Sequence, residues 1–407
     1  MSSPWWTRPG LDVREGRMFV AGRDAEAVAR GSGTPVFAYD LVRIEEQARS
    51  LIEAFERVQA PFRLRLALKA QREPEVLAFV RALGTVGLDV CSPGEIEHAL
   101  AHGWAPDELS FTGTNLSERD LDSIVPSGVH VNLDLLSQLR RFGRRAPGST
   151  VGIRINPRAG ASSRPELTGL YTGAAERPSK FGILEEQLDE ALEIAGAHDL
   201  RLDTVHFHVG RALLTDALPG LEVAVERASR VARRLMDAGH PVTEVNTGGG
   251  LGVPYDVDTP PLDVDAFAKL LARHLAPLGV AIACEPGDFL VKDMAVLLAE
   301  VVSVDDRDGH RFVGLDVGFN VAPERFIYDE PIPLVLCRAA DTPGDRPVTV
   351  AGNINEGNDL WAVDLPLPGV REGDVLALLR VGSYNRSMYS EHTLRPPAPT
   401  IAFADRI

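Results

Sequence analysis

Residues 63–71 read Arg-Leu-Arg-Leu-Ala-Leu-Lys-Ala-Gln, so that apolar residues alternate with charged ones before a small apolar segment that carries Lys69. This period of two predicts a β-strand with the lysine at its carboxyl end. In a barrel of strands and helices the carboxyl ends of the strands carry the chemistry, and an amine in apolar surroundings has a lowered pKa and becomes nucleophilic. Taken alone, the segment also fits a lysine that ends a strand and extends to solvent.

Similar short apolar runs recur on both sides of this stretch and alternate with helical patterns. The expected strands are residues 64–69, 87–91, 109–112, 130–134, 150–156, 204–209, 244–247 and 281–285. The clearest helical patterns are residues 93–102, 186–197 and 221–238. Eight strand-helix alternations predict an α/β fold, a parallel (β/α)₈ TIM barrel.

The residue composition and pattern of the sequence change at both ends of this region. Gly31-Ser32-Gly33-Thr34-Pro35 is a turn-rich hinge before an apolar strand at residues 36–39. Beyond the 290s, short β-rich runs such as Val301-Val302-Ser303-Val304 are broken by Gly, Pro and Asp, which predicts a largely antiparallel C-terminal β domain. We therefore expect an N-terminal segment (1–34) that joins the β domain, a barrel (35–295) and the β domain itself (296–407).

The charge of the chain argues for a small-molecule function. The formal charge of −16 over 407 residues repels phosphate backbones and anionic lipid, so we expect no nucleic-acid or membrane partner. Residues 1–6 lack the features of a leader peptide, and no apolar stretch is long enough to span a bilayer, which predicts a cytoplasmic protein. Cys91, Cys284 and Cys337 are widely spaced, which favours reduced thiols over disulfides or structural zinc.

Two strand ends carry groups that suit a phosphorylated aromatic cofactor. Asn246-Thr247-Gly248-Gly249-Gly250-Leu251-Gly252 offers backbone N–H groups that could bind a phosphate, although glycines also serve plain tight turns. Cys284-Glu285-Pro286-Gly287 places a carboxylate at the end of the next strand. That carboxylate could pair with a protonated pyridine nitrogen, or it could be a solvated glutamate before a Pro-Gly turn.

A third strand end carries two histidines. His206 and His208 are two residues apart and therefore point to the same face of their strand. No third ligand stands nearby, so we expect no metal, and an imidazole lying flat against an aromatic cofactor suits His208 better. Lys69, the glycine turn, Glu285 and His208 together describe a site for pyridoxal 5′-phosphate (PLP).

The order of these motifs resembles the fold-type-III PLP-dependent decarboxylases, which include the diaminopimelate and ornithine decarboxylases. The resemblance covers residues 35–396. The matching motifs are Leu-Ala-Leu-Lys69-Ala, Gly87-Leu-Asp89-Val-Cys-Ser-Pro-Gly-Glu95, Phe111-Thr-Gly-Thr-Asn115, Ser179-Lys180-Phe181-Gly182, His206-Phe-His208-Val-Gly210, Gly248-Gly-Gly-Leu-Gly252, Glu285-Pro-Gly287 and Gly382-Ser-Tyr384. The resemblance implies an alanine-racemase-like barrel with a C-terminal β domain, and a homodimer whose active sites are shared between subunits.

The resemblance also implies roles for individual residues. Lys69 would be the Schiff-base lysine, His208 the ring-stacking histidine and Glu285 the pyridinium partner, and these three would be catalytic. The residues implied around the phosphate are Gly249, Gly250, Gly287 and Tyr384, and those implied beside the cofactor are Asp89 and Arg154.

The sequence departs from the family at two positions of the phosphate site. The family usually has a serine after His-Val-Gly and an arginine after Glu-Pro-Gly, where this chain has Arg211 and Asp288. Asp288 alone would repel a phosphate dianion. We hypothesise a charge swap in which Arg211 restores the cation, binds the cofactor and pairs with Asp288.

Further departures concern the residues expected to contact the substrate. The family's Cys-Glu-Ser-Gly-Asp segment, whose cysteine protonates the carbanion, reads Asn355-Glu356-Gly357-Asn358-Asp359 here, so the acid must be Lys69, a water or another group. After Asp316, the arginine that grips the distal carboxylate of diaminopimelate is replaced by Glu324, with Arg325 beside it. The substrate-binding set is therefore expected to be Asp316, Glu324, Arg325, Asn355, Glu356 and Asp359.

These changes favour a decarboxylase of an amino acid or an amino-acid conjugate, such as a citryl-amino acid of siderophore biosynthesis. Diaminopimelate decarboxylation in lysine biosynthesis is the alternative. A racemase would need a second acid or base that the sequence does not reveal. A non-catalytic relative would be expected to lose Lys69, which is present.

Overall fold

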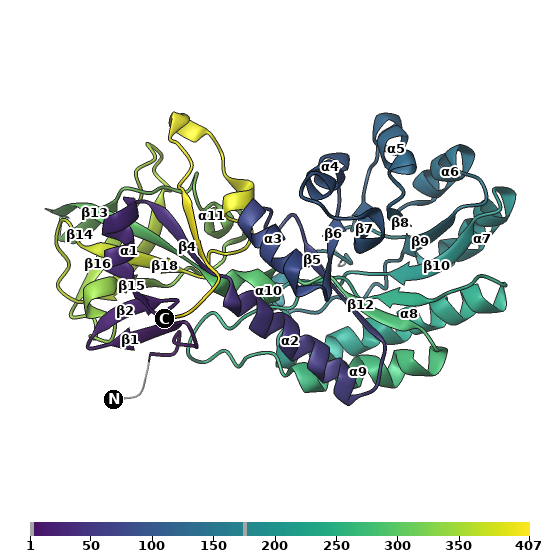
Figure 1. Ribbon diagram of the computed structural model, residues 1–407, viewed down its shortest axis with the longest axis horizontal. Coiled ribbons are helices and arrows are strands. Elements are labelled where there is room, and N and C mark those ends of the chain that lie inside the picture. The colour runs from purple at the N-terminus through teal and green to yellow at the C-terminus, as the bar shows by residue number, and fades with distance from the viewer. Residues whose placement is uncertain (1–3, 174–176) are drawn as a thin grey trace.

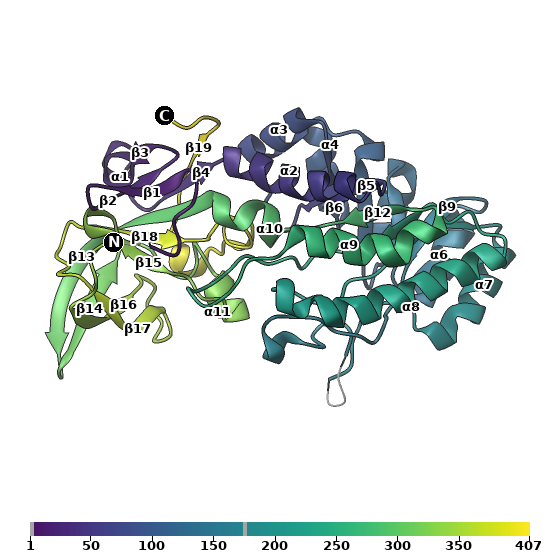
Figure 2. The ribbon, with the colours of Figure 1, turned by 90° about the horizontal axis from the view of Figure 1, so that it is seen from below.

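The computed structural model describes residues 4–173 and 177–407, and it consists of a barrel and a second, β-rich part (Figure 1). Figure 2 shows the two parts side by side along the long axis of the molecule, with α10 (Asp288–Val291) where the chain leaves the barrel.

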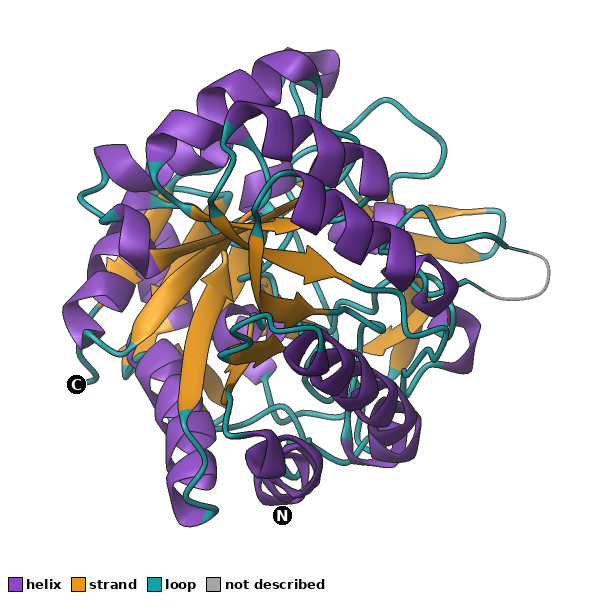
Figure 3. Cartoon of the chain, turned by 90° about the vertical axis from the view of Figure 1, so that its right-hand side faces the viewer, coloured by secondary structure: helices purple, strands orange, loops and turns teal. Residues whose placement is uncertain are grey.

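Eight parallel strands close the barrel in the order β10-β11-β12-β5-β6-β7-β8-β9, and helices surround them (Figure 3). The strands are β5 (Phe62–Ala67), β6 (Val86–Val90), β7 (Leu109–Gly113), β8 (His130–Leu133), β9 (Thr150–Arg154), β10 (Arg201–His206), β11 (Glu244–Asn246) and β12 (Ala281–Cys284). Each overlaps one of the eight strands expected from the sequence, so the predicted TIM barrel is confirmed.

The alternation in β5 reflects the two sides of the barrel wall. Leu64 and Leu66 are buried in the main hydrophobic core. Arg65 instead forms an ion pair with Glu244 of β11, with 2.7 Å between Nη1 and Oε1. A charged residue is tolerated inside the barrel because this partner neutralises it.

The helices that surround the barrel strands are α2 (Val42–Arg57), α3 (Pro74–Leu83), α4 (Pro93–Ala101), α5 (Glu118–Ile124), α6 (Leu136–Arg145), α7 (Leu188–Ala197), α8 (Leu218–Asp237) and α9 (Val264–Leu275). Of these, α4, α5 and α9 begin at a residue whose side chain accepts a hydrogen bond from a free backbone N–H group. In α4, the Ser92 side chain accepts a hydrogen bond from the Glu95 N–H, and Pro93 occupies the first turn, where no N–H is needed. Of the described residues, no helix is long and apolar enough to cross a membrane.

The second part is built on a sheet that runs β15-β18-β13-β14-β16-β17, with β4 and β19 attached to it. Its strands are β13 (Ala295–Arg307), β14 (His310–Leu315), β15 (Leu334–Leu336), β16 (Arg346–Ala351), β17 (Leu360–Leu367), β18 (Val375–Leu379), β4 (Val36–Asp40) and β19 (Thr400–Phe403). Most neighbouring pairs are antiparallel, as expected, while β14 with β16 and β19 with β4 are parallel.

The N-terminal segment packs on this sheet. It forms a three-stranded sheet and one helix, which are β1 (Leu11–Arg14), β2 (Arg17–Val20), β3 (Arg23–Asp24) and α1 (Ala25–Ser32). Met18 and Val20 share a hydrophobic cluster with Val296 and Val335 of the second part.

The apolar strand expected at residues 36–39 falls within the expected barrel limits, but it is not a barrel strand. Val36–Asp40 is β4, and it pairs with β13 of the second part. All five of its residues are buried, and the apolar run at residues 36–39 fits a central position in either sheet, so its pattern could not decide between them. The domain limits 1–34, 35–295 and 296–407 stay predictions, and residues 1–3 lie outside the described part.

Candidate active site

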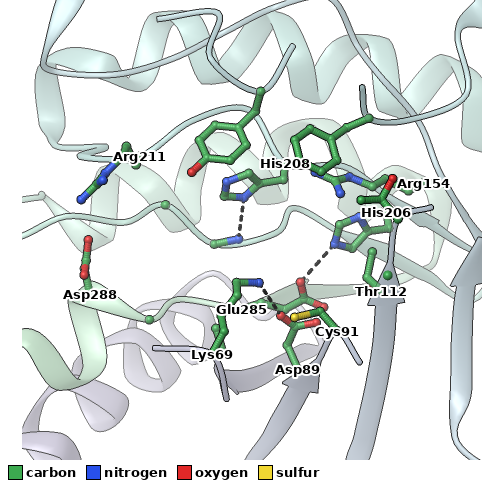
Figure 4. A pocket seen from close by; sticks show the side chains of 18 of the residues that line it. Lys69, Asp89, Cys91, Thr112, Arg154, His206, His208, Arg211, Glu285 and Asp288 are labelled. Carbon is green, nitrogen blue, oxygen red and sulfur yellow. Dashed lines mark hydrogen bonds and ion pairs between the residues drawn. The ribbon is translucent and has the colours of Figure 1, made fainter. Parts of the chain in front are cut away.

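A cavity of about 350 Å³ opens at the carboxyl ends of the barrel strands, where they meet the second part (Figure 4). This volume is within the usual range for small-molecule sites. Its lining residues are Ala67, Lys69, Asp89, Cys91, Thr112, Gly113, Thr114, Arg154, Tyr171, Phe181, His206, His208, Arg211, Gly249, Gly250, Glu285, Gly287, Asp288, Tyr328 and Tyr384. All ten residues expected to contact the cofactor are therefore brought together.

Lys69 lies two residues beyond the end of β5 and faces the cavity. Its Nζ is 3.2 Å from Oδ2 of Asp89, the last residue but one of β6. The cavity leaves 48% of the lysine side chain accessible. Burial acts to lower the pKa of Lys69, as the sequence led us to expect, but the charge of Asp89 and of other acidic groups outweighs it and raises this pKa well above its usual value. The prediction that Lys69 has a lowered pKa is therefore wrong.

Asp89 is buried and is the acid nearest to the lysine. Burial and the neighbouring charge of Glu285 raise its pKa to about 6, although Lys69 acts in the opposite direction. Its Oδ1 has no hydrogen-bond partner among the described residues.

Glu285 follows β12 and is held by the last residues of β10 and β11. His206 Nε2 is 3.0 Å from its Oε2, and the side-chain amide of Asn246 donates to Oε1. Burial would raise the pKa of Glu285, but the charge and hydrogen bond of His206 dominate and lower it to about 2. The carboxylate is therefore ionised at neutral pH and can hold a proton on a ring nitrogen.

His208 lies on the opposite side of the cavity from Lys69 (Figure 4). Its Nδ1 accepts a hydrogen bond from the Gly249 N–H at 3.3 Å, and the edge of its ring meets Tyr171 with 4.5 Å between ring centroids. Burial, helped by the positive charge of Arg154, lowers its pKa well below the usual value. A neutral imidazole is suited to lie against an aromatic ring.

Glycine is required where backbone segments meet at the cavity. Gly250 has a φ of +94°, and a Cβ there would lie 2.2 Å from the Gly210 carbonyl oxygen. A Cβ on Gly287 would lie 2.7 Å from Ala70 and 3.0 Å from the hydroxyl of Tyr384. These approaches leave backbone N–H groups next to the cavity, as a phosphate site needs.

Arg154 ends β9 and is nearly buried. Its Nη1 is 3.6 Å from Oδ1 of Asp134, and its guanidinium carbon is 4.3 Å from the centre of the Phe181 ring. Arg154 is thus fixed at the cavity wall from two sides.

Arg211 does not make the ion pair with Asp288 that the sequence suggested. Its Nη2 is 3.1 Å from Glu330 and 3.5 Å from Glu324, both from the second part. Asp288 accepts instead from the Ser383 hydroxyl at 2.6 Å.

In the described part of the chain, none of the six residues expected to bind substrate lines the cavity of its own chain. These are Asp316, Glu324, Arg325, Asn355, Glu356 and Asp359. Glu324 is fully buried with Lys292, at 2.6 Å, and Asp359 accepts from the backbone N–H groups of Ile354 and Phe319. Asn355 and Glu356 are exposed.

Sequence reasoning missed the residues that support the site. His206 and Asn246 hold Glu285, and their signal was their position at the carboxyl ends of β10 and β11. Tyr171 lines the cavity from a turn, and Tyr328 lines it from the end of the short helix α11 (Glu324–Tyr328), and neither segment is long enough for periodicity to be informative.

Comparison with known proteins identifies the family. The model of the family described as "Pyridoxal-dependent decarboxylase, pyridoxal binding domain" matches residues 41–292. The chain belongs to the pyridoxal-dependent decarboxylases. It is 34% identical to a diaminopimelate decarboxylase of Methanothermobacter thermautotrophicus, over 95% of this chain and 91% of that protein. It is 32% identical to a diaminopimelate decarboxylase of Streptomyces coelicolor, over 92% and 86% of the two chains.

Solved structures agree with this assignment. The chain resembles the crystal structure of a Helicobacter pylori diaminopimelate decarboxylase complexed with L-lysine, with a TM-score of 0.84, 26% identity and coverage of 93% and 94% of the two chains. A lysine/ornithine decarboxylase from Vibrio vulnificus, at 23% identity and a TM-score of 0.79, shares the fold.

The residues of this decarboxylase fit its cofactor, PLP. A lysine amine, an ionised Glu285, the neutral His208 ring and glycine N–H groups surround one cavity, and the buried Oδ1 of Asp89 lacks a partner among the residues that the structure describes. When bound, PLP supplies the electron sink that accepts the pair left when CO₂ departs.

Proposed function

We propose that this PLP-dependent decarboxylase removes one α-carboxylate of diaminopimelate, a reaction that yields lysine and CO₂. The observation that carries the proposal is the 34% identity to a protein of that name over 95% of the chain. The conjugate substrate favoured by the sequence has no such support, so we do not retain it as the leading proposal.

We assign the catalytic roles to Lys69, His208 and Glu285. The Lys69 amine would hold the cofactor and exchange it for the amine of the substrate. The His208 ring would stack on the cofactor, and the ionised Glu285 would hold a proton on its ring nitrogen. A positive charge kept there favours the loss of CO₂ because it stabilises the charge that develops.

We place the phosphate at the N–H groups of Gly249, Gly250 and Gly287 and at the Tyr384 hydroxyl. A phosphate needs several converging donors, and these residues share one wall of the cavity. Asp89 would orient Lys69, from which it is 3.2 Å away, and Arg154 would close the cavity beside Phe181.

We propose Lys69 as the acid that returns a proton to the α-carbon. Asn355 cannot donate a proton at neutral pH, and it is exposed in its own chain. Asp89 keeps the released lysine amine protonated, because it contributes to the raised pKa of that amine.

The homodimer with shared active sites stays a proposal, as does the cytoplasmic location. In such a dimer, Asn355 and Glu356 would approach the partner's cavity from an exposed loop. Asp359 is less suited to this role, because both of its oxygens already accept backbone hydrogen bonds. Sedimentation of the PLP-loaded protein would test the dimer.

The test of function is CO₂ release by the PLP-loaded protein. The substrates are diaminopimelate, lysine, ornithine, arginine, glutamate and citryl conjugates of small amino acids, with Lys69→Ala as the inactive control. Release from diaminopimelate in preference to the others supports the proposal. CO₂ release only from a conjugate would replace diaminopimelate with the conjugate as the proposed substrate. No CO₂ release from any of these compounds would favour a racemase or a non-catalytic PLP-binding relative.

A further inference from the structure

Two opposite charges face one another across one end of the cavity (Figure 4). Arg211 comes from the segment after β10, and Asp288 is the first residue of α10. Both line the cavity. Among the acidic groups, Asp288 does most to raise the pKa of Arg211. In the described ranges, however, the ion pairs of Arg211 are made with other acids.

Arg211 is held from the second part of the chain. Its ion pairs with Glu330 and Glu324 both use Nη2, and its guanidinium carbon lies 4.5 Å from the centre of the Tyr328 ring. A guanidinium has five N–H donors in a fixed plane. Among the described residues, the donors on Nε and Nη1 are left for a ligand.

Asp288 is held in a matching way. The Ser383 hydroxyl at 2.6 Å and the Lys292 amine at 3.7 Å both contact its Oδ1. Within the described part of the protein, Oδ2 is left for a ligand. The two charges are therefore held apart by separate partners, and the space between them stays open.

The surrounding charges are already paired with one another. Three cations, Arg164, Arg211 and Lys292, meet the acids Asp288, Glu324 and Glu330 in one network of ion pairs, and Arg164 also pairs with the exposed Glu166. A phosphate dianion next to Asp288 would be repelled, whereas a group that carries both an ammonium and a carboxylate adds no net charge.

We propose that Arg211 and Asp288 recognise the far end of the substrate as a zwitterionic amino-acid head group, with Arg211 binding its carboxylate and Asp288 its ammonium. This inference rests on the proposed function, because diaminopimelate carries such a group at each end. This assignment also explains Glu324, which occupies the position where the resemblance implies an arginine. Glu324 instead helps to hold Arg211, a cation that comes from the barrel. The inference moves Arg211 from the phosphate site to the substrate site.

The test compares three ligands that differ only at the far end. Diaminopimelate has both charges there, 2-aminopimelate has only the carboxylate, and lysine has only the ammonium. Their dissociation constants are measured on the PLP-loaded protein from the absorbance change of the cofactor, for the wild type, Arg211→Met and Asp288→Asn. Arg164→Met is the matched control, because Arg164 also pairs with Glu330, at 3.1 Å, but does not line the cavity.

Each variant should lose affinity for two ligands and keep it for the third. Arg211→Met should weaken diaminopimelate and 2-aminopimelate by about 10- to 100-fold, as expected for a hydrogen bond to a charged group, and leave lysine unchanged. Asp288→Asn should weaken diaminopimelate and lysine and leave 2-aminopimelate unchanged. Arg164→Met should show neither pattern.

Two results would overturn the inference. One is an equal loss for all three ligands in either variant. The other is a fall in PLP affinity of Arg211→Met with unchanged ligand constants, which would return Arg211 to the phosphate site. The proposed function fails separately: if the wild type releases no CO₂ from diaminopimelate but the ligand pattern holds, the head-group site stands without that reaction.

Discussion

Lys292 is the residue on which the buried ion network depends most. Its side chain is 3% exposed, and its Nζ is 2.6 Å from Glu324 and 3.7 Å from both Asp288 and Glu330. Lys292→Met would leave the buried Glu324 and Glu330 and the partly buried Asp288 without their lysine partner. Removing one partner of a buried ion pair costs about 3–5 kcal/mol, because a charge is left uncompensated, and we expect a loss of that size in the free energy of unfolding.

The assay is urea unfolding of the PLP-free protein, followed as the shift of the unfolding midpoint. The double variant Lys292→Met/Glu324→Gln is compared at about pH 9, where the Glu324 carboxyl, with its pKa of about 8, is ionised, so that the variant removes one cation and one acid together. Its loss of unfolding free energy should be smaller, by about 1–3 kcal/mol, than the sum of the losses of the two single variants. Arg57→Met is the control, since its ion pair with Asp265 is about half exposed on both sides and such pairs contribute about 0–1 kcal/mol.

The result that would refute this reasoning is additivity. The network would not act as a coupled unit if Lys292→Met lowered the free energy of unfolding no more than Arg57→Met does, or if the double variant lost the full sum of the two single losses. The support proposed for Arg211 would then lose its basis as well.

Three further outcomes are expected. Burial raises the pKa of Glu324 from 4.5 to about 8, so the native state binds more protons than the unfolded state between these values; the free energy of unfolding should fall as pH rises from about 4.5 to 8, and Glu324→Gln should flatten this slope in urea midpoints measured across that range. Lys69→Ala should hold no PLP covalently after borohydride reduction, read by intact mass, and a retained adduct would contradict the role of Lys69. Glu285→Gln should lower kcat for CO₂ release by about 10²–10³-fold, because it removes the charge that holds the ring proton, and an unchanged kcat would exclude that role.

The sequence indicated the barrel because its signals are local. The alternation around Lys69 and the apolar runs after it mark strands within a few residues of their observed ends. Since parallel strands in a closed barrel end at one rim, Lys69, Asp89, His208 and Glu285 had to share a cavity once the barrel was recognised. The sequence did not show that β4 pairs with β13 of the second part, because a buried apolar run looks the same in either sheet.

The sequence by itself determined the strand-helix alternation, the chemistry at the strand ends and the family they resemble. Only the tertiary structure decided which charges meet. Arg211 and Glu324 are 113 positions apart and belong to different parts of the molecule, so no spacing rule links them. The raised pKa of Lys69 and the lowered pKa of Glu285 likewise depend on the distances to Asp89 and His206. Ion pairs act through space, and their partners are therefore set by how the barrel packs against the second part rather than by the order of residues along the chain.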